Sequence, residues 1–182
     1  MSNDALASFE IFGVPLVYVR SGAGSPLVLS QEGIGDLRMV DRQVAAFSQR
    51  YEVIRYALHG FGRSGKPQVP FSHHEALKQL LDNLGIERTA LLGMSMGGQV
   101  AVEFALTYPD RVQALVLASA GLDDNEQPDE ETMRLVQPLI EASNAKDYVR
   151  LNEAEIHLWV DGPKRTPGQV DPAVRQLMLE LN

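Results

Sequence analysis

Residues 89–108 read TALLGMSMGGQVAVEFALTY and contain the pattern that decides the fold. An apolar run ends at Leu92, the five residues GMSMG (93–97) follow, and a segment with helical periodicity comes next. A serine between two glycines in G-x-S-x-G spacing suits a sharp turn from strand to helix, because glycine lets neighbouring backbones pass closely. Such a turn lifts the serine hydroxyl above the edge of a sheet. The segment therefore predicts a strand, a tight turn at Ser95 and a helix.

The same turn would arrange groups for acyl-transfer chemistry. Ser95 would supply a nucleophilic oxygen, and the backbone N–H of Met96 would point to the place where a negative oxygen forms during attack on a carbonyl. The N-terminus of the following helix favours negative charge at the same place. A chance match to G-x-S-x-G is the plain alternative, and the strand and helix on either side argue against it.

Strands and helices alternate on both sides of this segment. Short apolar runs predict strands at 9–12, 15–20, 27–30, 51–58, 89–92 and 113–119, and periodicity predicts helices at 39–50, 72–84 and 97–108. Ser72 and Glu75 have the spacing of a capping box at the start of the second helix. The continuous apolar runs indicate strands that are buried on both faces. We therefore expect an α/β fold with a mostly parallel sheet and helices on both faces.

The pattern changes after Gly121. An acidic stretch, DDNEQPDEE (123–131), precedes three expected helices at 130–142, 146–159 and 172–181, and this region contains no convincing strand. We therefore expect two parts, a core at 1–121 and a helical cap or lid at 122–182. Trp159 would line a largely apolar substrate pocket, and packing among the cap helices would explain it equally well.

The composition narrows the classes of function. The net charge of −8 argues against nucleic-acid binding, which needs a basic face. The chain has no cysteine, which excludes disulfides, thiolate zinc sites and cysteine nucleophiles, and no other grouping predicts a metal site. The first residues, MSNDALASFE, do not read as a signal peptide, and no apolar run approaches the roughly 18 residues that span a bilayer. We expect a cytoplasmic protein without membrane contact.

Residues 9–121 resemble the first six strands of the α/β-hydrolase superfamily. The resemblance rests on LVLSQEGIGDLRM (27–39), HGFGRSGKP (59–67) and the run 80–120 around Ser95. Within the superfamily, SQEGIGDLRM is similar to the corresponding loop of 3-oxoadipate enol-lactonases and esterase-like members. The resemblance implies a capped enzyme that needs no cofactor. Such an enzyme would cleave a small ester, lactone or related carbonyl substrate through an acyl-enzyme at Ser95.

The resemblance also implies where a second oxyanion donor lies. In this family the loop after the third strand supplies it, commonly with the sequence His-Gly-Gly. The loop here reads QEG at 31–33, so we place the donor at Glu32 or Gly33, beside the one at Met96. A carboxylate at Glu32 would oppose a developing oxyanion unless it turned away. A solvated loop acid is the ordinary alternative.

A serine nucleophile also needs a base and an orienting acid. The resemblance implies that the acid follows strand seven and the histidine follows strand eight, and neither strand is recognisable after Ser95. His157 is the one histidine after Ser95, so it is a candidate base, with a surface or packing role as the alternative. Asp123 follows the sixth strand, where some members place the acid, but it fits a polar loop as well. His73 and His74 start a helix and are expected to be exposed or to cap it.

Without strands seven and eight, the sixth strand would form an apolar, unpaired edge. Three explanations stay open: the chain is a fragment of a longer hydrolase, a second copy or complementing chain supplies the strands, or the cap covers the edge in a smaller protein. Three functions stay open as well. The chain could be a serine hydrolase, a non-catalytic or truncated binding protein without a complete triad, or an interaction module that recruits a partner through the sixth strand.

Overall fold

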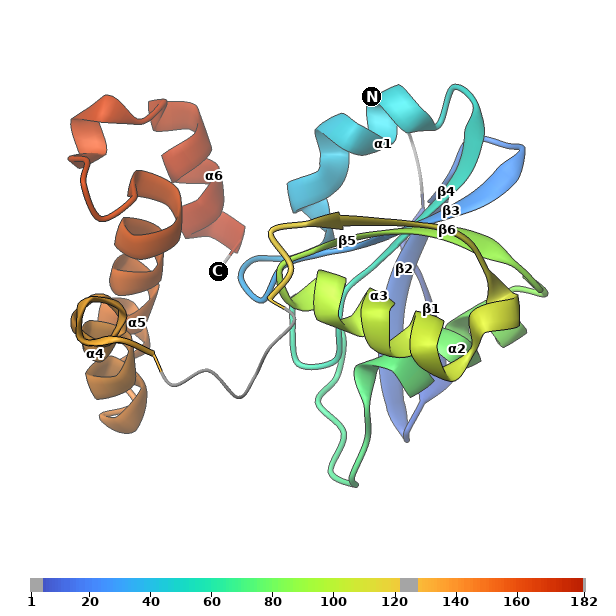
Figure 1. The fold of residues 1–182 in the computed structure, drawn as a ribbon, viewed down its shortest axis with the longest axis horizontal. Coiled ribbons are helices and arrows are strands. Elements are labelled where there is room, and N and C mark those ends of the chain that lie inside the picture. The colour runs from blue at the N-terminus through green and yellow to red at the C-terminus, as the bar shows by residue number, and fades with distance from the viewer. Residues whose placement is uncertain (1–4, 122–127, 182) are drawn as a thin grey trace. The chain divides into compact units, whose positions relative to one another are not determined.

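The computed structural model describes residues 5–121 and 128–181 (Figure 1). The chain separates into two compact units, Met1–Leu122 and Asp123–Asn182. No helix within the described ranges is long and apolar enough to cross a membrane.

The first unit is built on one six-stranded sheet with the strand order β1-β2-β4-β3-β5-β6. Strands β3, β4, β5 and β6 are parallel to one another, whereas β1 and β2 are antiparallel to their neighbours. The expectation of a mostly parallel α/β sheet is confirmed. The strands are β1 (Ala7–Ile11), β2 (Val14–Ser21), β3 (Ser25–Ser30), β4 (Tyr51–Tyr56), β5 (Thr89–Met94) and β6 (Val112–Ala118).

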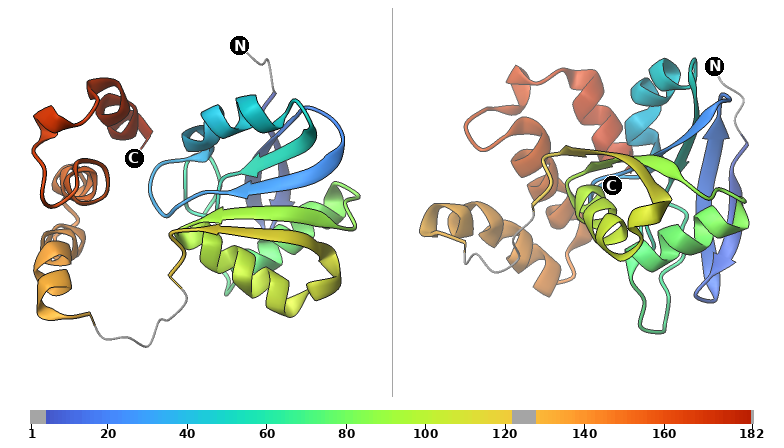
Figure 2. Two further views of the ribbon diagram at one scale, coloured as in Figure 1. Left: turned by 45° about the horizontal axis from the view of Figure 1, so that its top comes forward. Right: turned by 45° about the vertical axis from the view of Figure 1, so that its right-hand side comes forward.

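Helices cover both faces of this sheet (Figures 1 and 2). The 3₁₀ turn η1 (Leu37–Val40) and α1 (Asp41–Phe47) pack on one face, and α2 (His73–Asn83) and α3 (Met96–Thr107) pack on the other. Strand side chains alternate between the two layers. The α1 side receives Leu27, Leu29 and Val53, and the α2 and α3 side receives Val28, Ile54 and Leu91. The helix expected at 39–50 is shorter in the structure, because regular α-helix covers only Asp41–Phe47 and the residues before it form the 3₁₀ turn η1.

The expected capping box at the start of α2 is not formed. Ser72 is the N-cap residue, but its side chain makes no capping hydrogen bond. The carboxylate of Glu75 accepts a hydrogen bond from the hydroxyl of Tyr108, which follows α3. A tertiary partner thus occupies the side chain that a capping box would use.

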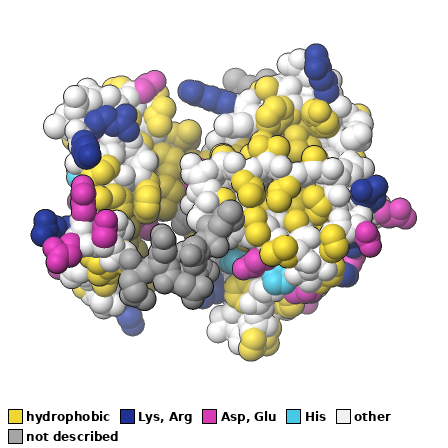
Figure 3. Space-filling view, viewed as in Figure 1, with side chains coloured by type: hydrophobic (Ala, Val, Ile, Leu, Met, Phe, Trp, Pro, Cys, Tyr) yellow, Lys and Arg dark blue, Asp and Glu magenta, His cyan; other side chains and the backbone are white. Residues whose placement is uncertain are grey.

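Strand β6 lies at the end of the strand order, and its side chains are exposed on both faces. The exposed fractions are 38% for Leu115, 52% for Val116 and 37% for Leu117. Hydrophobic side chains gather on the face that carries β6 (Figure 3). Burial on both faces, which the apolar run predicts, is therefore not found for this strand. Its outer edge has no partner strand within the described residues.

The second unit is helical. It comprises α4 (Glu130–Asn144), α5 (Tyr148–Glu155), the π-helical segment η3 (Ile156–Asp161), the turn η4 (Pro167–Gln169) and α6 (Pro172–Leu181). The helix expected at 146–159 is thus divided, since regular α-helix ends at Glu155 and wider π turns follow. The buried apolar residues of this unit are Ala142, Ile156, Leu158, Met178 and Leu181.

Candidate active site at the turn between β5 and α3

Ser95 occupies a strained turn between β5 and α3. Its φ is 48° and its ψ is −116°, a conformation that costs a non-glycine residue about 1–3 kcal/mol. Its backbone N–H donates to the carbonyl of Ala118 at 2.9 Å, and its carbonyl accepts from Gly98 at 2.8 Å and from Gln99 at 3.2 Å. The residue is exposed. Neighbouring backbone therefore holds Ser95 in this conformation while its side chain stays accessible.

The two glycines of the G-x-S-x-G pattern are places of close backbone approach. A Cβ atom on Gly93 would lie 2.3 Å from the carbonyl oxygen of Gly97. A Cβ atom on Gly97 would lie 2.3 Å from the carbonyl oxygen of Ser30 and 2.4 Å from that of Gln31. No side chain fits at either position, since real Cβ atoms essentially never approach other atoms within 3.0 Å. The second glycine thus brings the end of β3 directly against the start of α3.

Gly98 has the same role, and the sequence pattern does not include it. A Cβ atom at this position would lie 2.5 Å from the Cβ of Ala120, just beyond β6. The signal in the sequence is the glycine pair at 97–98, which opens a helix, where glycine is otherwise unfavourable. The start of α3 is therefore packed tightly against both β3 and the end of β6.

The loop after β3 lies beside the first residue of α3. A Cβ atom on Gly33 would be 3.2 Å from the sulfur of Met96 and 3.6 Å from its Cβ. Met96 is the first residue of α3, where a backbone N–H has no partner within the helix. The structure places Gly33 against Met96, and Glu32, the third residue from which we expect an oxyanion donor, directly precedes Gly33 in this loop. These contacts do not distinguish Glu32 from Gly33 as the second donor.

Glu32 does not have the environment of a solvated acid. Its side chain is half-buried, and Oε2 is buried without a hydrogen-bond partner among the described residues. Burial raises the pKa of Glu32, and a hydrogen bond with its own backbone opposes that rise only in part. A carboxyl group that resists ionisation therefore lies in the loop next to Met96.

His59 begins the loop after β4 and is 3% exposed. Its Nδ1 lies 2.9 Å from the carbonyl oxygen of Gly65, so Nδ1 carries the proton and donates. Nε2 is buried without a described partner, and the rings of Phe12 and Phe71 pack against the imidazole. Burial lowers the pKa of His59. His59 is thus a neutral residue that anchors its loop.

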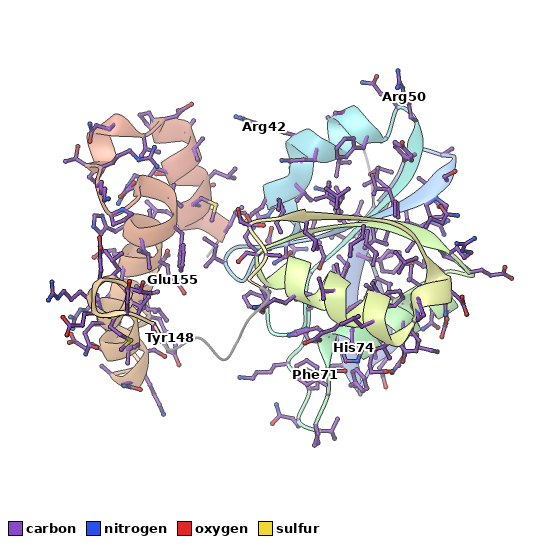
Figure 4. All side chains as sticks on the ribbon, viewed as in Figure 1. Arg42, Arg50, Phe71, His74, Tyr148 and Glu155 are labelled. Carbon is purple, nitrogen blue, oxygen red and sulfur yellow. The ribbon has the colours of Figure 1, made fainter. Side chains whose placement is uncertain are left out.

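His73 and His74 differ from their expected exposed or capping roles, because both are half-buried against neighbouring elements. His74 is hydrogen-bonded through Nδ1 to Glu103 of α3 at 2.9 Å, and Figure 4 labels His74 and the nearby Phe71. His73 packs against the ring of Phe71. Burial lowers the pKa of His73, and repulsion between the two rings when His59 is also protonated lowers it further. Both histidines bind other side chains of this layer.

In the second unit, His157 is exposed and lies on the π-helical segment η3. Its Nδ1 is 3.9 Å from a carboxylate oxygen of Asp161, which is too far for a hydrogen bond. Asp161 is fully buried, and Arg175 donates to its two oxygens at 3.1 and 3.3 Å. Trp159 is 61% exposed, so core packing does not account for it. Asp123 lies outside the described residues.

Within the described ranges, no group of three His, Cys, Asp or Glu residues has the geometry of a metal site.

Comparison with known proteins relates the first unit to hydrolases. The family model described as alpha/beta hydrolase fold matches residues 26–139. A hydrolase from Pseudomonas aeruginosa is 26% identical, with a TM-score of 0.78 over 100% of this chain and 68% of that one. The enol-lactonase of Burkholderia xenovorans is also 26% identical, with a TM-score of 0.77 over 96% of this chain and 66% of that one.

Among curated proteins, the 2-hydroxy-6-oxononadienedioate/2-hydroxy-6-oxononatrienedioate hydrolase of Paraburkholderia phymatum is 46% identical over 85 residues. This match covers 44% of the chain and 30% of that hydrolase. The chain thus spans about a third of the length of this relative.

Proposed function

Because the chain belongs to the α/β-hydrolase fold family, we propose that it acts as a serine hydrolase on a small ester, lactone or related carbonyl substrate. The observation that carries this proposal is the strained backbone of Ser95, which presents an exposed hydroxyl at the start of α3. A residue holds such a conformation only where the surrounding structure imposes it, and these places are often functional. Enol-lactone cleavage by the similar Burkholderia enzyme supports this substrate class.

The reaction would proceed through an acyl-enzyme. Ser95 Oγ attacks the carbonyl carbon while a base takes its proton, and the C=O bond becomes a C–O⁻ group. The backbone N–H of Met96 and that of Glu32 or Gly33 would stabilise this oxyanion. Collapse breaks the bond to the leaving oxygen, which takes the proton from the base and becomes an alcohol or an enol, still joined to the acyl chain in the case of a lactone. Water then attacks the acyl-enzyme while the base takes its proton, and the acid is released as that proton returns to Ser95 Oγ. These steps need no metal or cofactor.

We propose that the base and the orienting acid come from a segment that adds strands to β6, in a longer hydrolase of which this chain is a part, in a second copy or in a complementing chain. The described histidines of the first unit have other structural partners: His59 binds Gly65, His74 binds Glu103, and His73 packs on Phe71. The exposed apolar strand β6 offers an unpaired edge for such a segment. His157 stays a candidate base. Its separation from Asp161 counts against a preformed dyad.

A non-catalytic binding protein is the second candidate. It is favoured by the absence, among the described residues, of a histidine hydrogen-bonded to a carboxylate near Ser95. His74 does bind Glu103, but Glu103 lies two turns along α3. In this case Ser95 would be idle, and a small carbonyl ligand would bind equally well to Ser95→Ala. A cytoplasmic location stays a prediction under either function.

Turnover of short p-nitrophenyl esters and of small lactones tests the proposal. We expect hydrolysis that is lost in Ser95→Ala and retained in Ser119→Ala. Ser119 is a matched control, because it is also an exposed serine with a positive φ, of 52°, yet no helix starts there. Equal activity of the wild type and Ser95→Ala would exclude Ser95 as the nucleophile.

A further inference from the structure

Glu32 is fixed in position by its two neighbours. On one side, the carbonyl oxygen of Gln31 packs against Gly97 so closely that a side chain at position 97 would collide with it. On the other side, Gly33 lies against the side chain of Met96. A Cβ atom placed on Gly33 would be 3.2 Å from the sulfur of Met96. The residue between them is therefore held beside the start of α3, where the oxyanion would form.

The charge of the Glu32 carboxyl group is stabilised only by a hydrogen bond with its own backbone. Oε2 is buried and makes no hydrogen bond with the described residues. The causes that act on the pKa of Glu32 are burial, which raises it, and a hydrogen bond with its own backbone, which lowers it. No described lysine or arginine is among these causes. An unpaired carboxylate is costly to bury, so the neutral form is favoured.

We propose that Glu32 is a positioning residue that acts as a charge gate: the protonated form leaves the oxyanion site able to accept negative charge, and the ionised form opposes it. The proposal rests on the proposed function in taking Ser95 as the place where the negative charge develops. In the protonated form the conflict of an acid in an oxyanion loop does not arise, because a neutral carboxyl group exerts no repulsion.

The other titratable groups near this loop would not change charge together with Glu32. Asp36 is desolvated, but the hydrogen bonds and charge of Arg38 lower its pKa on balance, so it is ionised throughout. Burial raises the pKa of Tyr56 to about 12, and its hydroxyl lies 3.1 Å from Ser30 Oγ. Burial lowers the pKa of His59, so this histidine is neutral at pH values above the ordinary histidine pKa. The adjoining residues of α3, Met96 and Gly97, do not titrate.

A fixed charge at position 95 tests the gate without any catalysis. The chain has no cysteine, so Ser95→Cys provides a single thiol for alkylation. Iodoacetate adds a carboxylate there, and iodoacetamide adds a neutral amide of similar size. The protonation of Glu32 is then followed by ¹³C NMR of the labelled glutamate carboxyl carbons, with Glu32→Gln identifying the signal.

We expect Glu32 to titrate above the ordinary value of about 4.3 in the unmodified protein. The carboxymethyl group should increase the proton affinity of Glu32 relative to the neutral amide, on the order of tenfold, since like charges repel and the coupling is reciprocal. An ordinary titration, or the same titration with both adducts, would overturn the proposal. If the two adducts shift the titration of Glu32 differently but the wild-type protein hydrolyses no ester, the gate is supported and hydrolysis at Ser95 is refuted.

Discussion

Alanine at position 97 would place a methyl group 2.3 Å from the carbonyl oxygen of Ser30 and 2.4 Å from that of Gln31. Ordinary contact begins at 3.4 Å, so the backbone of β3 or of α3 would have to move by about 1 Å. Both neighbours are backbone carbonyl groups at the end of β3, and neither can rotate away as a side chain could. We therefore expect Gly97→Ala to lower the free energy of unfolding by about 3 kcal/mol or more, at the upper end of overpacking effects.

Urea unfolding followed by circular dichroism measures this loss, provided that the slope of the transition is unchanged. Gly85→Ala is the control for conformation alone, because Gly85 has a φ of 69° and open space around it. That variant should lose about 1–2 kcal/mol. Gly168→Ala has open space and no such φ, and it should be near neutral. If Gly97→Ala lost less free energy than Gly85→Ala, the close-packing argument for the motif would be refuted.

Three further predictions concern β6, the loop after β4 and the buried histidines. Val116→Lys should reduce self-association, measured by size-exclusion chromatography, and the binding of a hydrophobic dye, since Val116 is 52% exposed on an edge strand. A wild-type protein that is monomeric and binds no dye would contradict the proposal that β6 pairs with a further segment. Ser64→Ala should cost about 1–3 kcal/mol in urea unfolding, because Ser64 Oγ accepts from Val17 at 2.9 Å and donates to Ala57 at 2.7 Å. A cost near zero would mean that this bridge is unimportant. Burial lowers the pKa of His59 and of His73, so the unfolded chain binds more protons and unfolding free energy should fall as pH drops below about 6.5. His59→Gln should flatten this fall. The raised pKa of Glu32 gives the opposite trend, in which the free energy of unfolding falls as the pH rises above about 4.3, and Glu32→Gln should remove it.

The sequence was sufficient to predict the elements that local pattern controls. The elbow at 93–97 follows from the spacing of its glycines, because those positions must lack side chains for β3 to approach α3. The parallel sheet follows from continuous apolar strands that alternate with helices. These features depend on short stretches of chain.

Features that depend on distant neighbours could not be predicted. The apolar run of β6 taken alone indicates burial, and its exposure was expected only because the resemblance implies a seventh and an eighth strand that the described residues do not show. Glu32 is an acid in a glycine-containing loop, which usually means solvent, and its burial arises from the packing of that loop against Met96. Likewise, Glu75 has capping-box spacing, but Tyr108 from a different helix binds it.

The most direct test of the central claim is intact-mass spectrometry before and after treatment with a fluorophosphonate probe, which labels only an activated serine. We expect a stoichiometric mass increase in the wild type and in Ser119→Ala, and none in Ser95→Ala. Stoichiometric labelling would mean that the chain or its assembly supplies a working base. A folded wild-type protein that gains no mass, or a Ser95→Ala variant that is labelled as well as the wild type, would contradict a nucleophilic Ser95.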